Sequence, residues 1–184
     1  MTDPLPDFLA SKSIDKVWPS LVSVFDAIEL YRPHLTASKL ALVNGIRPKE
    51  VWTYSITNKE TPPLVYAFDH WKNMRDNFRE IATWWHMDQT SGGDCFDSTD
   101  GGKVTADYAT LYVDFDHDAN LLSRRQLAAD QAVEDMRLVM FLKRKYSGDP
   151  SKLTEIQNVV DETVKKGTMK AIDSARSRLL DLLR

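Results

Sequence analysis

The stretch HWKNMRDNFREIATWW (residues 70–85) has the clearest structural pattern in the chain. Its large apolar side chains recur every three or four positions, which places them on one face of an α-helix. They are Trp71, Met74, Phe78, Ile81, Ala82 and Trp85. Charged residues fill the opposite face of this helix. We therefore predict a helix over residues 70–85, begun by Asp69 as N-cap, that buries Trp71, Phe78 and Trp85.

The segments on either side of this helix are predicted to be strands and a loop. The apolar run LVYAF (residues 64–68) follows two prolines and has the composition of a strand. Residues 86–102 are rich in Asp, Ser, Thr and Gly, as loops are. Residues 103–115 then read as a strand whose two faces are both mainly apolar. Such a strand is typical of the centre of a sheet that is covered on both sides.

The last third of the chain, residues 119–184, is predicted to be helical. A first helix reaches Tyr146, and the sequence SGDP (residues 147–150) ends it. We expect Ser151 to cap a second helix and Gly167 to interrupt it. The residues expected to point inward on the last helix are Ile172, Leu179 and Leu183.

Ahead of residue 61 the sequence predicts mainly helices. Residues 1–12 contain prolines and are expected to form an extended arm. Apolar residues at helical spacing predict a helix over residues 13–31. A short second helix is expected between Thr36 and Gly45.

Together these patterns predict an α+β, helix-dominated fold. It has N-terminal helices, a small sheet with a central strand near residues 103–115, and a helical C-terminal third. A length of 184 residues fits one domain over residues 1–184, and 42% hydrophobic residues supply a core.

The composition also favours some cellular settings over others. Cys95 is the only cysteine, so neither an internal disulfide nor a cysteine pair for zinc is expected. No apolar run approaches the roughly 18 residues of a membrane helix, and the first residues lack the pattern of a signal peptide. The sequence therefore predicts a soluble, cytoplasmic protein without a membrane partner.

The formal net charge of −3 conceals an uneven distribution. Residues 31–60 have five bases against two acids, a balance of +3, whereas residues 86–118 have eight aspartates against one lysine, a balance of −7. Basic clusters also occur at residues 124–125 and 143–145. Clusters of this kind are typical of a solvated face, and they also suit contact with phosphate or with an acidic partner.

The stretch TASKLALVNGIRPKEVWTYS (residues 36–55) resembles the helix-turn-helix motif of DNA-binding proteins. Two helices cross closely in that motif, so it needs a small residue at the crossing and a glycine at the turn. Ala41 and Gly45 stand at those positions. The apolar positions of the motif correspond to Leu40, Ile46, Val51 and Tyr54.

This resemblance implies a regulatory protein that contacts duplex DNA within a segment spanning residues 13–60. It implies that Arg47, Lys49, Glu50 and Thr53 face the major groove. It also implies that Thr36, Ser38 and Lys39 contact phosphates. The same residues allow a helix followed by a strand, because residues 51–56 have strong β-propensity.

A pair of aspartates suggests a different chemistry. Asp114 and Asp116 are two apart at the end of a predicted strand, so their carboxylates would project to the same side. Paired carboxylates hold divalent metal in many phosphoryl-transfer enzymes, which makes Mg²⁺ the cofactor to consider. In the alternative interpretation no cofactor is bound, and acids here serve only as caps at the start of the next helix.

Three classes of function follow from these patterns. The first is a DNA-binding regulator that acts through residues 36–55. The second is a non-catalytic interaction or assembly protein, with a protein partner or a second copy of itself. The third is a metal-dependent nucleotide or nucleic-acid enzyme using Asp114 and Asp116. Because no strong catalytic signature is present, a non-enzymatic role is favoured.

Overall fold

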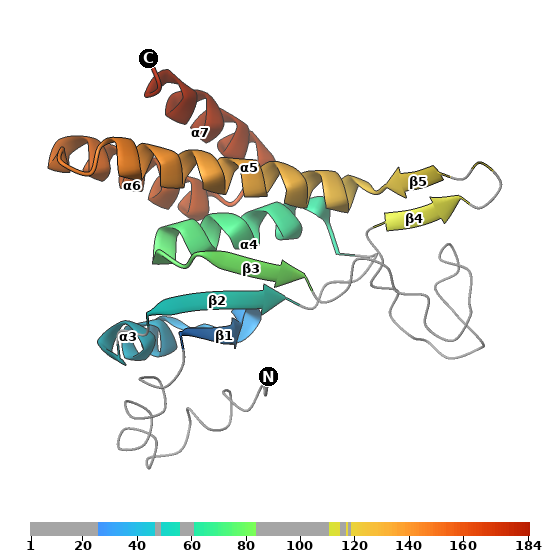
Figure 1. Cartoon of the computed structure of the whole chain (residues 1–184), viewed down its shortest axis with the longest axis horizontal. Coiled ribbons are helices and arrows are strands. Elements are labelled where there is room, and N and C mark those ends of the chain that lie inside the picture. The colour runs from blue at the N-terminus through green and yellow to red at the C-terminus, as the bar shows by residue number, and fades with distance from the viewer. Residues whose placement is uncertain (1–25, 47–48, 56–60, 84–110, 115–116, 118) are drawn as a thin grey trace, which may run out of the picture.

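The computed structural model describes residues 26–46, 49–55, 61–83, 111–114, 117 and 119–184 (Figure 1). The elements in chain order are β1 (Ala27–Tyr31), the short 3-10 helix η1 (Arg32–His34), α3 (Ala37–Ile46), β2 (Glu50–Ser55), α4 (Pro63–Asp76), β3 (Glu80–Thr83), β4 (Leu111–Asp114), β5 (Ala119–Leu122), α5 (Arg124–Lys145), α6 (Pro150–Lys166) and α7 (Met169–Asp181). The helix-dominated α+β class and the helical C-terminal part are confirmed.

The larger sheet is parallel and has the strand order β1-β2-β3. Ile28 is in register with Val51, and Thr53 with Ile81. β4 and β5 form a separate antiparallel pair. The central strand of the larger sheet is therefore β2, and the described end of the predicted strand at 103–115 belongs to the two-stranded pair.

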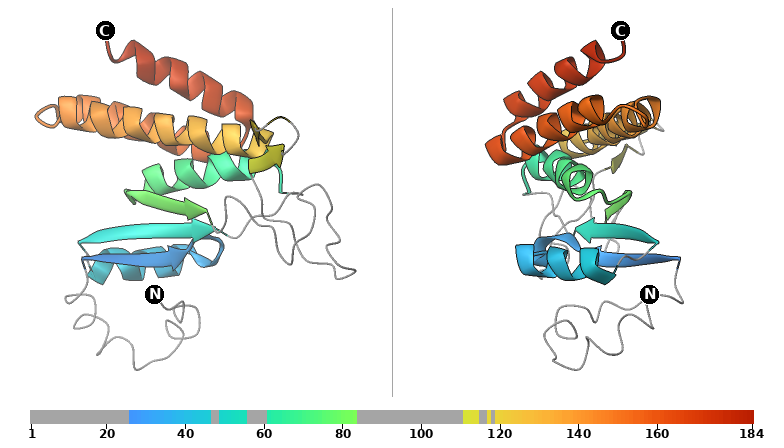
Figure 2. Two further views of the ribbon diagram at one scale, coloured as in Figure 1. Left: turned by 45° about the vertical axis from the view of Figure 1, so that its right-hand side comes forward. Right: turned by 90° about the vertical axis from the view of Figure 1, so that its left-hand side faces the viewer.

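The helices α3 and α4 contact the same face of the larger sheet. Successive side chains of a strand point to opposite faces, so Val51, Thr53 and Ser55 share one side. Val51 packs with Val43 of α3 in a small core cluster, while Thr53 contacts α4 through Asn73. The side of α4 that faces away from the sheet packs on α5 and α6. We call α5, α6 and α7 the helical layer, and α4 lies between this layer and the sheet (Figures 1 and 2).

The prediction around α4 was right about burial and wrong about the boundaries of the helix. Residues 64–68 are helical, because Pro63 stands at the first position of α4, where its missing N–H is harmless. The helix ends at Asp76, and Asn77 follows with φ 58° in the left-handed region. Phe78 then lies beyond the helix, although it is buried as predicted.

Two other details of α4 differ from expectation. Asp69 is not the N-cap but a buried residue within the helix. Ile81, which was predicted to lie on the apolar face of the helix, belongs instead to the strand β3. Trp71 and Met74 are buried as expected, whereas Trp85 lies outside the described residues.

The helix predicted over residues 13–31 is contradicted at its end. Residues 27–31 form β1, which pairs along its length with β2. Ile28 and Leu30 are buried with the alternation of a strand. The residues from 1 to 25 lie outside the described part of the chain. The second predicted helix is confirmed as α3, which continues one residue past Gly45.

The helical layer follows the sequence closely, with small shifts of the caps. Residues 119–122 form β5, and the side chain of Ser123 caps α5 by accepting from the Gln126 backbone N–H. Asp149, not Ser151, caps α6, with Pro150 at its first position. Ile172 and Leu179 of α7 are buried as predicted, but Leu183 is exposed.

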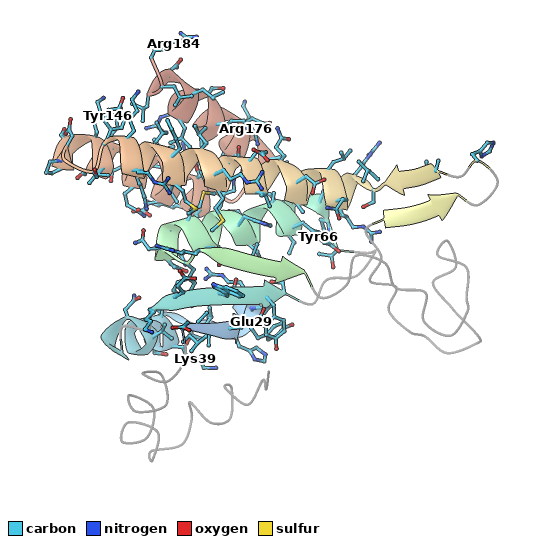
Figure 3. The ribbon with its side chains drawn as sticks, in the orientation of Figure 1. Glu29, Lys39, Tyr66, Tyr146, Arg176 and Arg184 are labelled. Atoms are coloured by element: carbon cyan, nitrogen blue, oxygen red, sulfur yellow. The ribbon has the colours of Figure 1, made fainter. Side chains whose placement is uncertain are left out.

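A salt bridge joins the first and last helices of this layer. Arg176 of α7 donates to both carboxylate oxygens of Asp135 in α5, at 2.6 and 2.9 Å (Figure 3). Asp135 is buried, so the bidentate geometry compensates its lost hydration. Among the described residues, no helix is both long and apolar enough to cross a membrane.

Gly167 ends α6 with φ 60°, and we expect Gly167→Ala to destabilise the chain by about 1 kcal/mol. A Cβ there would lie 3.6 Å from Phe68 Cζ, an ordinary contact, so the cost comes from the backbone conformation. Gly148→Ala is the matched control, because its Cβ would meet nothing within 4 Å. Urea denaturation followed by circular dichroism measures both variants. Equal effects would show that the left-handed conformation is not the cause.

Candidate interaction surface between α4 and α5

The structure contradicts the helix-turn-helix resemblance. The second helix of that motif would span residues 47–55, but residues 50–55 are β2, paired on both sides with β1 and β3. Gly45 does not make the turn either, because α3 runs through it to Ile46. β-branched and aromatic residues in β2 favour the strand, as their β-propensity indicated.

The residues expected to contact phosphates lie at the start of α3. Thr36 and Ser38 have their hydroxyl oxygens 2.9 Å apart. The backbone N–H of Lys39 donates to Thr36 Oγ1 at 3.4 Å, which satisfies one free N–H of the helix start. These residues therefore have a structural role at the end of a helix.

The residues expected in the major groove are not all available to a ligand in the part of the chain that is described. Lys49 pairs with Asp26 at 2.6 Å in an exposed salt bridge. Glu50 accepts from Arg79 at 2.7 Å. Thr53 is fully buried against Asn73, so it cannot contact a large ligand. Arg47 lies outside the described residues.

The aspartate pair is only partly within the described residues. Asp114 is the last residue of β4 and is in register with Ala119 of β5. Asp116 lies outside the described part, so the proposed Mg²⁺ site stays a prediction. The N-cap of the next helix is Ser123 and not one of these acids, because the helix begins later than predicted.

A row of buried polar contacts holds α4 against β2. The hydroxyl of Ser55 donates to Asp69 Oδ2 at 2.6 Å, and Lys72 Nζ donates to Asp69 Oδ1 at 2.8 Å. The side chains of Asn73 and Thr53 form a second contact, with Asn73 Nδ2 lying 2.7 Å from Thr53 Oγ1. Because buried polar groups are costly unless paired, these contacts fix the position of α4 on the sheet.

A buried ion pair lies at the end of the same interface. Arg32 Nη2 is 2.7 Å from Asp76 Oδ2, and the two side chains are 3% and 9% exposed. Burial lowers the pKa of the Arg32 guanidinium, and the Asp76 carboxylate opposes that shift. The guanidinium also lies 5.9 Å from the ring centre of Phe78. This pair anchors the C-terminal end of α4 to the strand layer.

The turn after α4 is tied to the helical layer through Asn77. Asn77 has a left-handed backbone, and its side-chain oxygen accepts from Lys143 Nζ at 2.7 Å. Lys143 also donates to Gln157 Oε1 of α6 at 2.9 Å. Burial lowers the pKa of Lys143, and Asp161 raises it in part. The turn therefore forms a fixed wall beside α5.

Two hollows meet at this turn. One has a volume of about 450 Å³, lies between α3, the start of β2 and the end of α4, and has a largely charged lining. Its cations Lys49, Arg75 and Arg79 are already paired with carboxylates. The charges that line this hollow are therefore largely balanced by neighbouring side chains.

The second hollow, about 350 Å³, lies between the end of α4 and α5, and we name it the α4–α5 groove. Its lining residues are Met74, Asn77, Phe78, Arg79, Met136, Val139, Met140, Lys143 and Arg144. Sulfur atoms are visible between α4 and α5 in Figure 3. Met140 is 41% exposed, whereas Met74, Met136 and Val139 beneath it are buried. The groove thus has an apolar floor open to solvent.

Sequence reasoning found only part of this groove. The sequence shows the basic cluster at residues 143–145 and predicts that Met74 lies on the apolar face of a helix. Nothing in the local pattern shows that Asn77 and Lys143, which are 66 residues apart in the sequence, are in contact. The exposure of Met140 beside the buried Met136 and Val139 is the feature that reveals the groove.

Comparison with protein-family models, with curated proteins and with solved structures finds no match for this chain. Function is therefore inferred from the geometry of the chain itself.

Proposed function

We propose that this chain is a non-catalytic interaction protein that binds a partner protein at the α4–α5 groove. The observation that carries the proposal is an apolar floor, formed by three methionines and a phenylalanine, that opens to solvent at Met140. Methionine is flexible and polarisable, so it adapts to bulky side chains and is frequent at binding surfaces. A concave apolar site with a few polar groups at its edge is typical of binding sites.

The walls of the groove are well supported, which favours binding. Met74 and Met136 belong to the main core cluster, so the floor is held by packing. The polar contacts of Asp69 and Asn73 hold α4 on its other side. Because the groove is already formed, a partner loses little free energy in ordering it.

A photo-crosslinking side chain placed at position 140 in cells is expected to join the chain to a discrete partner protein. The control position is Lys170, which is exposed on α7, away from the groove. A variant that has the crosslinker at position 144 together with Met140→Glu should not form that product, because the new carboxylate would lie in the apolar floor. The proposal fails if positions 140 and 170 yield the same products.

A gel shift with random duplex DNA separates this function from nucleic-acid binding. We expect no shift at low ionic strength, with or without Mg²⁺. A shift that weakens steeply with salt would instead support a nucleic-acid role, because phosphate contacts release counterions.

A further inference from the structure

The charged residues that line the α4–α5 groove are basic. Among its lining residues, Arg79 lies on the side of the α4–β3 turn, and Lys143 and Arg144 lie on α5. Within the described part of the chain, no acidic residue lines the groove. This local charge is opposite in sign to the formal net charge of the chain, which is −3. The groove is therefore a local basic site on a chain that is acidic as a whole.

Two of these cations have no carboxylate as direct partner among the residues that the structure describes. Lys143 donates to the neutral amides of Asn77 and Gln157, and Asp161 acts on it from outside the groove. Within the described residues, Arg144 makes no side-chain hydrogen bond or ion pair. Arg79 pairs with Glu50 but is 63% exposed, so that pair contributes little.

We propose that the partner segment bound by the groove is an acidic peptide with a bulky apolar side chain between its acids. This inference rests on the function proposed above and names the chemistry of the partner. The apolar side chain would enter between Met74 and Met140, while carboxylates on either side of it reach Arg79 and Arg144.

The size of the groove agrees with such a segment. A volume of about 350 Å³ is at the small end of the range for ligand sites, roughly 300–1,000 Å³. It accommodates a large side chain rather than the face of a folded domain. Cations on opposite walls also fix the direction from which the flanking acids approach, so charge supplies specificity and the apolar floor supplies affinity.

The test uses the full chain and a fluorescein-labelled peptide of glutamates with a central phenylalanine. Fluorescence anisotropy should show binding that weakens with salt. A peptide with alanine in place of phenylalanine, and one with lysines in place of glutamates, should not bind. Met140→Glu should weaken the acidic peptide by more than about tenfold, which corresponds to 1.4 kcal/mol.

A charge reversal distinguishes recognition from a change of fold. Arg144→Gln should weaken binding about threefold, the effect of one exposed ion pair. Arg144→Glu should weaken the acidic peptide further and reduce the difference in affinity between the acidic and the lysine peptide. Arg124→Gln is the matched control, because Arg124 is exposed at the opposite end of α5. Its affinity should equal that of the parent chain.

Failure of this inference and failure of the proposed function give different results. If position 140 crosslinks to a partner but the acidic peptide does not bind, the partner chemistry is wrong and the interaction function stands. Equal binding of acidic and basic peptides, or no effect of Met140→Glu, would also overturn the inference.

Discussion

Trp71→Ala is expected to lower the free energy of unfolding by about 3–5 kcal/mol, the usual cost of truncating a buried tryptophan. Trp71 is 0% exposed and belongs to the main core cluster, where α4 meets the helical layer. Its indole Nε1 has no hydrogen-bond partner within the described residues. The loss therefore comes from the cavity and from lost apolar transfer, with no polar contribution.

Trp52→Ala provides the control for this substitution. Trp52 is on the central strand but is 37% exposed, so its removal should cost about 1 kcal/mol or less. Urea denaturation followed by circular dichroism measures both losses. If Trp71→Ala does not fold, Trp71→Phe should show a smaller loss of the same sign. A loss below about 1.5 kcal/mol for the alanine variant would show that the surroundings collapse into the cavity.

Asp76→Ala should destabilise the chain by about 3–5 kcal/mol, because it leaves the buried Arg32 guanidinium without a counter-charge. Only 3% of the Arg32 side chain is exposed, so water cannot replace the carboxylate. Arg32 Nη1 already lacks a partner within the described residues, which makes the remaining contact more important.

Two further variants separate the charge from the packing. Arg75 also pairs with Asp76 but is 36% exposed, so Arg75→Ala should cost less than about 1 kcal/mol. Replacing both members of the buried pair, with Arg32→Met and Asp76→Leu together, should cost less than Asp76→Ala alone. If the double replacement is as costly as the single one, packing rather than charge explains the loss.

The sequence predicted the helical layer well because its signals are local. Pro150 and Gly167 mark a helix start and a helix end through their own backbone restrictions, whatever the rest of the chain does. The errors there were small. Asp149 caps α6 in place of Ser151, residues 119–122 form β5, and Leu183 is exposed.

The parallel sheet was missed because its signals are non-local. Ile28 has helical spacing with earlier apolar residues, but its partner in the sheet, Val51, lies more than twenty positions away. Pairing with β2 overrides the local preference. In the same way, residue 78 was placed on a helix because Asn77 gives no strong sequence signal for the left-handed turn it makes.

The candidate site could be predicted only in its composition. Lys143 and Arg144 stand out as a basic cluster, and Met140 as an apolar residue on the same helix. These residues lie across the groove from Met74 and Arg79 because α4 packs against α5. The spacing of apolar residues along the sequence does not specify which helices pack together. The helix-turn-helix assignment failed for a related reason, because residues 50–55 pair as a strand and Thr53 is buried by a helix that follows it in the chain.

The position of α4 between two cores has a consequence for cooperativity. One side of the helix is satisfied by polar contacts with the central strand, and the other contributes Ala67, Trp71 and Met74 to the helical core. If either core loses its packing, one side of α4 is exposed to water. The helix is then less stable, and so are its contacts with the other core. The stabilities of the sheet and of the helical layer are therefore thermodynamically coupled through a single helix of 14 residues.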